Sequence, residues 1–236
     1  MSDAPAPSAV LAIDGPGGAG KGTVSLRVAR QLGWHYLDSG ALYRLVAVAA
    51  ARDGVDLDDG DALARAVARL KIEFRLTADA LQVLLDGADV TVAIREEACA
   101  RAASRLAVHA PLRAALLPLQ RAFARPPGLV AEGRDMGTVV FPDAVLKIFL
   151  TASAEQRAQR RWLQLSQAGV DASLAAILDD LRRRDAQDAS RAAAPLRPAD
   201  DAVFVDSSGL TVEEVCARIV GHLEERGLTV GDRPVR

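Results

Sequence analysis

Short strand-like runs alternate along the chain with longer stretches in which apolar residues recur every three or four positions. The first pattern is typical of buried parallel strands and the second of helices with one apolar face. Strands that are separated by helices predict an α/β fold with a parallel five-stranded sheet and helices on both faces. The five predicted strands are Ala9–Ile13, His35–Leu37, Leu129–Ala131, Val145–Leu150 and Ala202–Val205.

One stretch breaks this alternation. Between about Leu70 and Val92, the segments KIEFRL, LQVLL and ADVTV alternate over short lengths around turn-like ADA and DG sequences, which predicts a small antiparallel meander. Two helices should follow, one near Arg95–Val108 and one from Pro111, because proline suits a first helical turn. We therefore expect a core of residues 8–66 and 128–226, an insertion at 67–127, and flexible tails at 1–7 and 227–236.

Composition limits the classes of partner. The 236 residues are half apolar, with a net charge of −2 and a pI near 6.0, which argues against a broad electrostatic grip on nucleic acid or an anionic membrane. Cys99 and Cys216 lack metal-ligand spacing, and we expect both to be buried. The segment MSDAPAPSAV has neither a basic region nor an apolar stretch of signal length, and no apolar run approaches about 20 residues. We therefore expect a cytoplasmic protein, by default a monomer, that binds small molecules.

A glycine-rich segment, GPGGAGKGT at Gly15–Thr23, follows the first predicted strand and precedes an amphipathic helix. Glycines let backbone N–H groups converge on phosphate oxygens, the helix N-terminus adds positive charge, and lysine reaches the terminal phosphates. The strict pattern has Ser or Thr directly after Lys21, but Gly22 stands there. A plain turn would not explain four glycines followed by a lysine, so the segment predicts nucleoside triphosphate binding by Gly15, Pro16, Gly17, Gly18, Ala19, Gly20, Lys21, Gly22 and Thr23.

A second motif, DSGALYR at Asp38–Arg44, follows the second strand and opens a helix whose apolar face should carry Leu42, Leu45, Val46 and Ala49. That phasing leaves Tyr43 and Arg44 off the apolar face, near a strand's carboxyl end, where open α/β sheets bind ligands. Arg44 could hold a second phosphate or be a solvated side chain. Ser39 could contact substrate or be an ordinary helix N-cap.

A third motif, EGRDMGT at Glu132–Thr138, follows another strand. In a phosphate-binding sheet this position suits Arg134 for the substrate and Asp135 as a carboxylate facing the site near Mg²⁺. The alternative is a structural salt bridge between Arg134 and Asp135.

Two helical segments carry further arginines. Ser153 and Gln156 form a capping-box signature, after which Arg157, Arg160 and Arg161 share one side of a helix. This arginine face could close over a triphosphate or be merely solvated. The second segment places Arg184, Asp188 and Arg191 on one surface line, either as an ion-pair ladder or as two phosphate clamps that a carboxylate orients.

Taken in order, GPGGAGKGT, DSGALYR, EGRDMGTVVFPDAVLKIFL, RD..D..R and APLRPADDAVFVDSS resemble the bacterial cytidylate kinase family from about Val10 to Glu225. The resemblance implies a P-loop nucleoside monophosphate kinase fold, with the insertion binding the monophosphate and a lid at about 154–168. It implies transfer of the ATP γ-phosphoryl group to CMP or dCMP with Mg²⁺, as part of pyrimidine nucleotide metabolism. It places Arg160 and Arg161 in the lid, and Gly17 departs from the serine expected there.

The resemblance also implies roles for individual residues. Lys21, Arg134, Arg160, Arg161 and Arg191 would be catalytic, and no protein group is assigned as a direct metal ligand. The acceptor phosphate would be held by Arg44, Arg134 and Arg191, the cytosine edge read by Ser104, Arg113 and Asp135, the ribose met by Arg184 and Asp188, and the pocket lined by Ser39.

The chemistry needs no nucleophilic side chain. An acceptor phosphate is already ionised near neutral pH, so catalysis reduces to alignment and charge neutralisation. His35, His109 and His222 form no triad pattern and are expected to be structural or on the surface. Two alternative functions fit less well. A kinase for a small alcohol would not explain the second arginine cluster, formed by Arg44, Arg134 and Arg191. A nucleotide-dependent switch would need an Asn-Lys-x-Asp sequence, which is absent.

Overall fold

The computed structural model describes residues 8–76, 81–167 and 169–228 and divides into two compact units. The first unit comprises the residues up to Tyr36 and those from Ala124 onward, and the second comprises Leu37–Phe123. The predicted tail 1–7 and most of the tail 227–236 lie outside the described residues. The units are defined by compactness, so the division by binding role stays a prediction.

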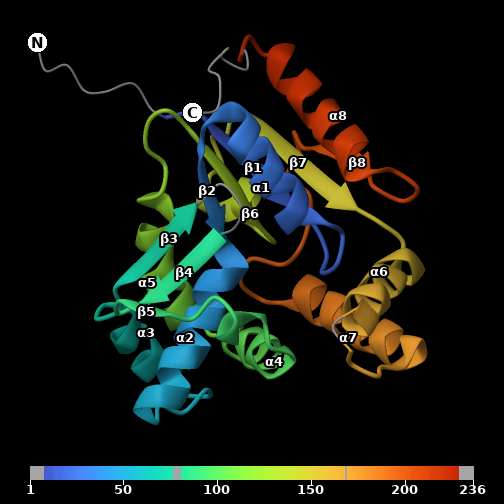
Figure 1. Cartoon of the computed structure of the whole chain (residues 1–236). Coiled ribbons are helices and arrows are strands. Elements are labelled where there is room, and N and C mark those ends of the chain that lie inside the picture. The colour runs from blue at the N-terminus through green and yellow to red at the C-terminus, as the bar shows by residue number, and fades with distance from the viewer. Residues whose placement is uncertain (1–7, 77–80, 168, 229–236) are drawn as a thin grey trace, which may run out of the picture. The chain divides into compact units, whose positions relative to one another are not determined.

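The first unit is built on the predicted parallel sheet, which is confirmed (Figure 1). The strand order is β2-β6-β1-β7-β8, and the boundary between the units falls within β2. The central strand β1 is buried along its whole length, which explains its uninterrupted apolar sequence. The strands are β1 Val10–Asp14, β2 His35–Asp38, β6 Leu129–Gly133, β7 Leu146–Thr151 and β8 Val203–Asp206.

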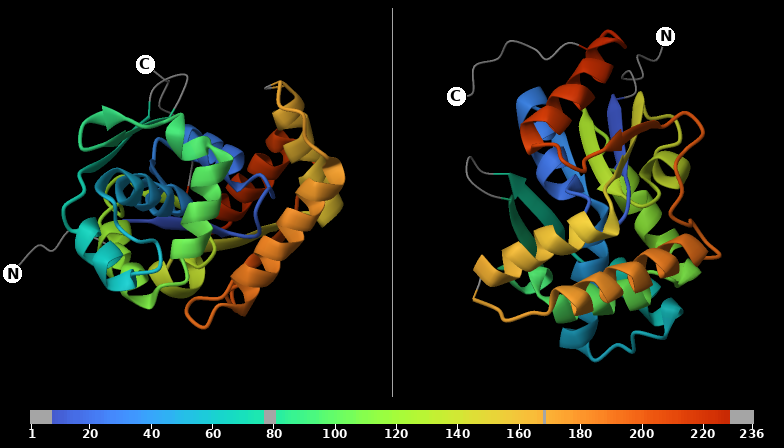
Figure 2. Two further views of the ribbon diagram at one scale, coloured as in Figure 1. Left: turned by 90° about the horizontal axis from the view of Figure 1, so that it is seen from below. Right: turned by 90° about the vertical axis from the view of Figure 1, so that its right-hand side faces the viewer.

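Helices of this unit flank the sheet. Helix α1 buries Val24, Val28 and Ala29 and packs against α8, and α6 and α7 lie side by side in both views of Figure 2. Helix α8 begins with a capping box between Thr211 and Glu214. The helices are α1 Lys21–Leu32, α6 Ala154–Gln167, α7 Leu174–Ser190, α8 Val212–Glu224 and a single π-helical turn, η2 Met136–Val140.

The second unit contains the predicted antiparallel meander. Its strands are β3 Ile72–Leu76, β4 Leu81–Leu85 and a two-residue β5 Ala88–Asp89, and the turn predicted at ADA lies outside the described residues. Helix α3 packs against α5 and α2 against α4, and Pro111 lies in the first turn of α5 as predicted. The helices are α2 Ser39–Asp53, α3 Gly60–Val67, η1 Ala93–Arg95, α4 Glu97–Leu106 and α5 Ala110–Arg121.

Candidate active site

The glycine-rich loop connects β1 to α1 through backbone conformations that need glycine. Gly15, Gly18 and Gly20 have φ angles of 153°, 78° and 92°, and a Cβ added at Gly15 would lie 2.0 Å from the carbonyl oxygen of Leu150. Lys21 opens the helix, is almost fully buried, and donates from Nζ to the carbonyl oxygen of Pro16 at 2.8 Å. The loop therefore has the strand, glycine turn and helix N-terminus that phosphate binding requires.

Asp14, the last residue of β1, fixes the turn that follows β6. Its two carboxylate oxygens accept the backbone N–H groups of Met136 and Gly137, each at 2.8 Å. Burial raises the pKa of this carboxyl from 3.8 to about 6, although both hydrogen bonds oppose the rise. The nearby charge of Asp135 also raises this pKa, and that of Lys21 lowers it.

Glu132 lies beside the position at which the loop departs from the strict motif. The side chain is buried and accepts a hydrogen bond from the hydroxyl of Tyr36. A Cβ added at Gly22 would lie 3.3 Å from Oε1 of Glu132, a close contact that a shift of the carboxylate by a few tenths of an ångström would relieve. The strict motif uses a hydroxyl at that position to bind a cation, and here a carboxylate lies next to it.

These residues fit a divalent cation that enters with the nucleotide. Magnesium ions in such sites keep several waters and use one or two protein oxygens together with phosphate oxygens. The buried carboxylate of Glu132 and the exposed hydroxyl of Thr23, in the first turn of α1, are oxygen ligands of that kind. Among the described residues, no group of three or more His, Cys, Asp or Glu side chains could hold a metal by itself.

Arg134 and Arg191 share one carboxylate. Arg134 donates from Nε to Oδ2 of Asp188 at 2.8 Å, and Arg191 donates to Oδ1 of the same residue. The alternative of a salt bridge between Arg134 and Asp135 is therefore wrong. Along the predicted surface line of α7, Arg184 forms an ion pair with Asp180 at 2.8 Å, one turn before Arg184 and two turns before Asp188.

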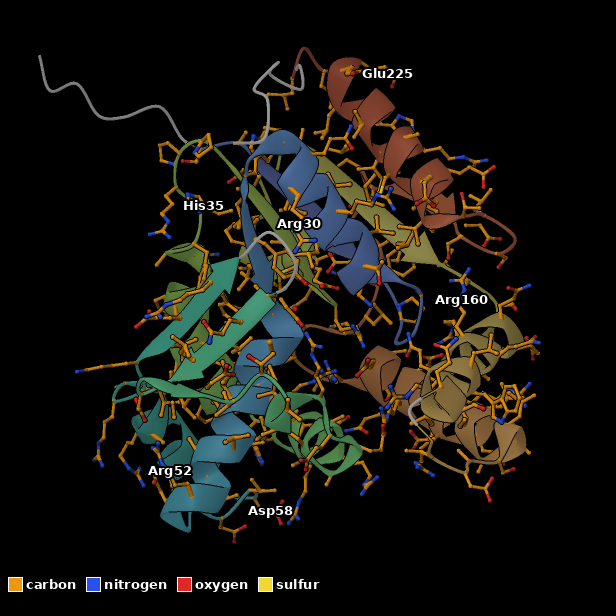
Figure 3. The ribbon with its side chains drawn as sticks, viewed as in Figure 1. Arg30, His35, Arg52, Asp58, Arg160 and Glu225 are labelled. Atoms are coloured by element: carbon orange, nitrogen blue, oxygen red, sulfur yellow. The ribbon has the colours of Figure 1, made fainter. Side chains whose placement is uncertain are left out.

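The arginines in the first turns of α6 have different surroundings, whereas the sequence predicted one shared arginine face. Ser153 Oγ accepts the N–H of Gln156 at 3.2 Å, in agreement with the capping signature. Arg157, however, is only 5% exposed rather than solvated, and its guanidinium donates hydrogen bonds to Ala152 O, Gly17 O and Asp185 Oδ2. Arg160, labelled in Figure 3, donates to the hydroxyl and the carbonyl oxygen of Ser207 at 3.1 and 2.6 Å. Arg161 is half-buried.

The second unit holds the other predicted site residues, and α2 corrects two expectations. Asp38, not Ser39, is the N-cap, since Asp38 Oδ1 accepts the N–H of Ala41 at 2.9 Å. The hydroxyl of Ser39 instead donates to Gln120 Oε1 at 2.7 Å. Tyr43 is 8% exposed rather than off the apolar face, because α2 is buried on most of its circumference.

Of the remaining predicted residues in this unit, Arg113 stacks over the ring of Tyr43, with its Cζ 5.7 Å from the ring centroid. Arg44 is half-buried and makes a long hydrogen bond of 3.4 Å to the carbonyl oxygen of Ile94. Ser104 is half-buried on α4. The binding roles of these residues stay predictions.

Residues without a predicted site role behave mostly as expected. His35, His109 and His222 bond to Pro126, Leu57 and Glu225 and form no triad. Cys216 is buried, but Cys99 is only half-buried, so that expectation was wrong for Cys99. No helix in the described ranges is long and apolar enough to span a membrane.

Sequence reasoning missed two residues that contact the loop. Arg157 was grouped with an arginine face because its helical spacing is visible and its burial is not. Ser207, whose hydroxyl donates to the carbonyl oxygen of Ala19 at 3.1 Å, was visible only as part of VDSS after the last strand. A hydroxyl directly after a strand's carboxyl end was the signal available for it.

Comparisons with known proteins agree with the motif order. The sequence profile of the family described as "Cytidylate kinase" matches residues 11–225. The chain is 53% identical over 223 residues to the cytidylate kinase of Pseudomonas paraeruginosa, covering 94% of this chain and 97% of the relative. It is 53% identical over 224 residues to that of Stutzerimonas stutzeri, covering 94% and 98%. A solved structure of an uncharacterized protein from Eubacterium ventriosum shares the fold, with a TM-score of 0.51, 11% identity, and coverage of 92% and 99%.

Proposed function

The chain belongs to the cytidylate kinase family, and from this premise we propose that it transfers the γ-phosphoryl group of ATP to CMP or dCMP, giving ADP and CDP or dCDP. It is a nucleoside monophosphate kinase, a phosphotransferase whose acceptor is a phosphate group. The observation that carries the proposal is the loop Gly15–Thr23, which stands at the carboxyl end of the central strand in a chain that matches the family from residue 11 to 225.

The ATP phosphates would bind to the N–H groups of Gly15–Thr23, with Lys21 on the terminal phosphates. Lys21 Nζ donates to Pro16 O within its own loop, so it would exchange that carbonyl for a phosphate oxygen when ATP enters. An anionic phosphate is the stronger partner for the ammonium, because it carries a full negative charge whereas the carbonyl oxygen is neutral.

The family implies a divalent metal with ATP, and we propose Mg²⁺. The hydroxyl of Thr23 and the carboxylate of Glu132, directly or through water, would hold it beside the loop. When bound, the ion would neutralise charge on the β- and γ-phosphates. Tyr36 would keep the carboxylate of Glu132 in place through its hydrogen bond.

The acceptor phosphate would be held by guanidinium groups, which donate paired hydrogen bonds to phosphate oxygens. We assign Arg44, Arg134 and Arg191 to that phosphate by resemblance. Asp188 supports the assignment, since its carboxylate accepts hydrogen bonds from both Arg134 and Arg191 and would orient the two guanidinium groups. The base would be read by Ser104, Arg113 and Asp135, the ribose would meet Arg184 and Asp188, and Ser39 would line the pocket.

Catalysis by these residues consists of positioning and charge stabilisation. The acceptor phosphate oxygen is ionised near neutral pH and attacks the γ-phosphorus without a general base. Lys21 and the lid arginines Arg160 and Arg161 would stabilise the charge on the transferring group. Arg160 would first release Ser207, to which it donates two hydrogen bonds. A lid that closes on ATP would exclude water and limit hydrolysis.

A coupled assay of ADP release tests the proposal with ATP and a panel of CMP, dCMP, UMP, AMP and shikimate. We expect turnover with CMP and dCMP and slow ATP hydrolysis without an acceptor. Activity on shikimate alone would identify a kinase for small alcohols instead, and equal ADP release with and without CMP would refute lid closure. We also propose that the enzyme acts as a cytoplasmic monomer, which light scattering of the purified protein checks for the oligomeric state.

A further inference from the structure

Carbonyl oxygens of the glycine-rich loop accept hydrogen bonds from side chains. A loop that turns its N–H groups toward phosphates must turn carbonyl oxygens elsewhere, and carbonyl oxygens away from water need donors. Three loop carbonyls have such donors. Pro16 O accepts from Lys21 Nζ, Gly17 O from Arg157 at 2.9 Å, and Ala19 O from Ser207 Oγ.

Two of these donors come from outside the loop, Ser207 from the segment after β8 and Arg157 from α6. From the first turn of α6, Nε of Arg157 donates to Ala152 O at 3.0 Å, and one terminal nitrogen donates to Gly17 O. The other terminal nitrogen donates to Oδ2 of Asp185 on α7 at 2.6 Å. A Cβ added at Gly18 would lie 3.2 Å from Cβ of Arg157, so the loop packs directly on the stem of this side chain.

We propose that Arg157 is a positioning residue for ATP, which fixes the glycine-rich loop in its phosphate-binding conformation, and that Asp185 orients it. The inference rests on the proposed binding of ATP by Gly15–Thr23. Arg157 acts through the carbonyl of Gly17 and does not need to touch the nucleotide.

The arrangement suits a planar guanidinium. Three acceptors in three directions match the fixed fork of arginine, whereas a lysine ammonium at the end of a flexible stem would not reach all three together. Asp185 depends on the same contact, because its Oδ1 is buried without a hydrogen-bond partner among the described residues. Removal of the guanidinium would leave Gly17 O and the carboxylate of Asp185 without their donor, which is costly for buried groups.

The alternative is that Arg157 only ties α6 to α7. A second ion pair, Arg182 with Glu155 at 2.9 Å, joins the same two helices on the surface and does not touch the loop. It provides a matched control. If tying the helices were the whole role, loss of Arg157 would weaken ATP and CMP binding alike.

The test measures dissociation constants of ATP and of CMP separately by calorimetry on the full chain. Arg157→Met should weaken ATP binding about 10-fold or more, as expected for loss of a charge-assisted hydrogen bond, and change CMP binding by less than about twofold. Arg157→Lys should restore part of the loss. Arg182→Met should change neither constant by more than about twofold.

Two results would overturn the inference: unchanged ATP affinity in Arg157→Met, or equal weakening of ATP and CMP. Should Arg157→Met fail to fold, Asp185→Asn replaces it, since asparagine keeps an acceptor for the guanidinium but removes the charge. Wild-type ATP affinity in Asp185→Asn would then refute the orienting role and the inference with it. Failure of the wild type to bind ATP would instead refute the proposed function.

Discussion

The two units differ in where they place charge. Among the described residues, the first unit buries six charged side chains, whereas the buried polar side chains of Leu37–Phe123 are the neutral Ser39 and Gln120, which bond to each other. The charged residues that the structure describes in Leu37–Phe123 lie at intermediate depth or on the surface, some of them in ion pairs such as Arg105 with Asp58. The six buried charges are Asp14, Lys21, Glu132, Asp135, Arg157 and Asp188.

We propose that the unit with buried charges carries out phosphoryl transfer and that the other unit recognises the acceptor. Burial of a charge is costly unless it is paired, while exposed ion pairs contribute about 0–1 kcal/mol. The first unit accepts that cost around the loop Gly15–Thr23, where the proposed mechanism would stabilise charge on the transferring phosphoryl group. The second unit has no such concentration of buried charge, which is consistent with a role in holding an acceptor. Changes of buried charge in the first unit should therefore have the larger effects.

The largest effect is expected for Lys21, which is buried at the start of α1. Lys21→Ala should lower turnover by about 10²- to 10³-fold, the range for removal of one preorganised electrostatic contact, with a smaller effect on CMP binding. Steady-state kinetics with saturating ATP and CMP measures it. Lys71→Ala is the matched control, since Lys71 is an exposed lysine of the second unit. Near-normal turnover in Lys21→Ala would refute its catalytic role.

The second effect concerns stability and pH. The folded carboxyl of Asp14 has a pKa of about 6, above the value of 3.8 for the unfolded chain, so the folded state binds the proton more tightly. The stabilisation by this proton is complete below about pH 3.8 and is lost as pH rises through about 6. The pKa difference corresponds to roughly 100-fold in the folding equilibrium, about 3 kcal/mol.

Urea unfolding of the nucleotide-free wild type and of Asp14→Asn, from pH 4 to 8, isolates this contribution because asparagine does not titrate. The unfolding free energy of the wild type, relative to the variant, should fall between pH 4 and about 6.5 and then become constant. Parallel pH profiles of the two proteins would show that Asp14 titrates normally. No buried carboxyl of the second unit offers an equivalent test among the described residues.

A smaller effect is expected in the second unit, on one helix that carries both the variant and its control. Arg44→Met should raise the KM for CMP about 10-fold, because a charge-assisted bond to the acceptor phosphate is lost, with little change in the KM for ATP. Arg52→Met, labelled in Figure 3, removes an exposed arginine that pairs with Asp53 and Asp86 on the same unit, and should leave both constants within about twofold. Equal effects of the two substitutions would contradict the assignment of Arg44.

Sequence patterns predicted the elements better than the depth of individual side chains. The parallel strands and the meander follow from local apolar patterns, and the loop follows from its glycines. Helical spacing could show that Arg157, Arg160 and Arg161 share a side, but the burial of Arg157 depends on the Gly17 carbonyl and on Asp185, distant in sequence. Likewise, Tyr43 is covered because α2 is surrounded by its unit, which its own periodicity does not reveal.

The smallest effect is expected inside the loop itself, at Gly17, where the family resemblance would place a serine. A Cβ added at Gly17 would lie 3.5 Å from a terminal nitrogen of Arg134 and 3.9 Å from Leu181, which is ordinary contact, and its φ angle is not positive. Gly17→Ser should therefore keep turnover and the KM for ATP within about twofold. Gly15→Ser is the contrasting variant, because its Cβ would lie 2.0 Å from Leu150 O, and it should lose stability by at least about 1–3 kcal/mol. If Gly17→Ser instead abolished ATP binding, the space available to the phosphates at Gly17 would determine ATP binding. Buried charge and the fixed backbone of the first unit would then matter less.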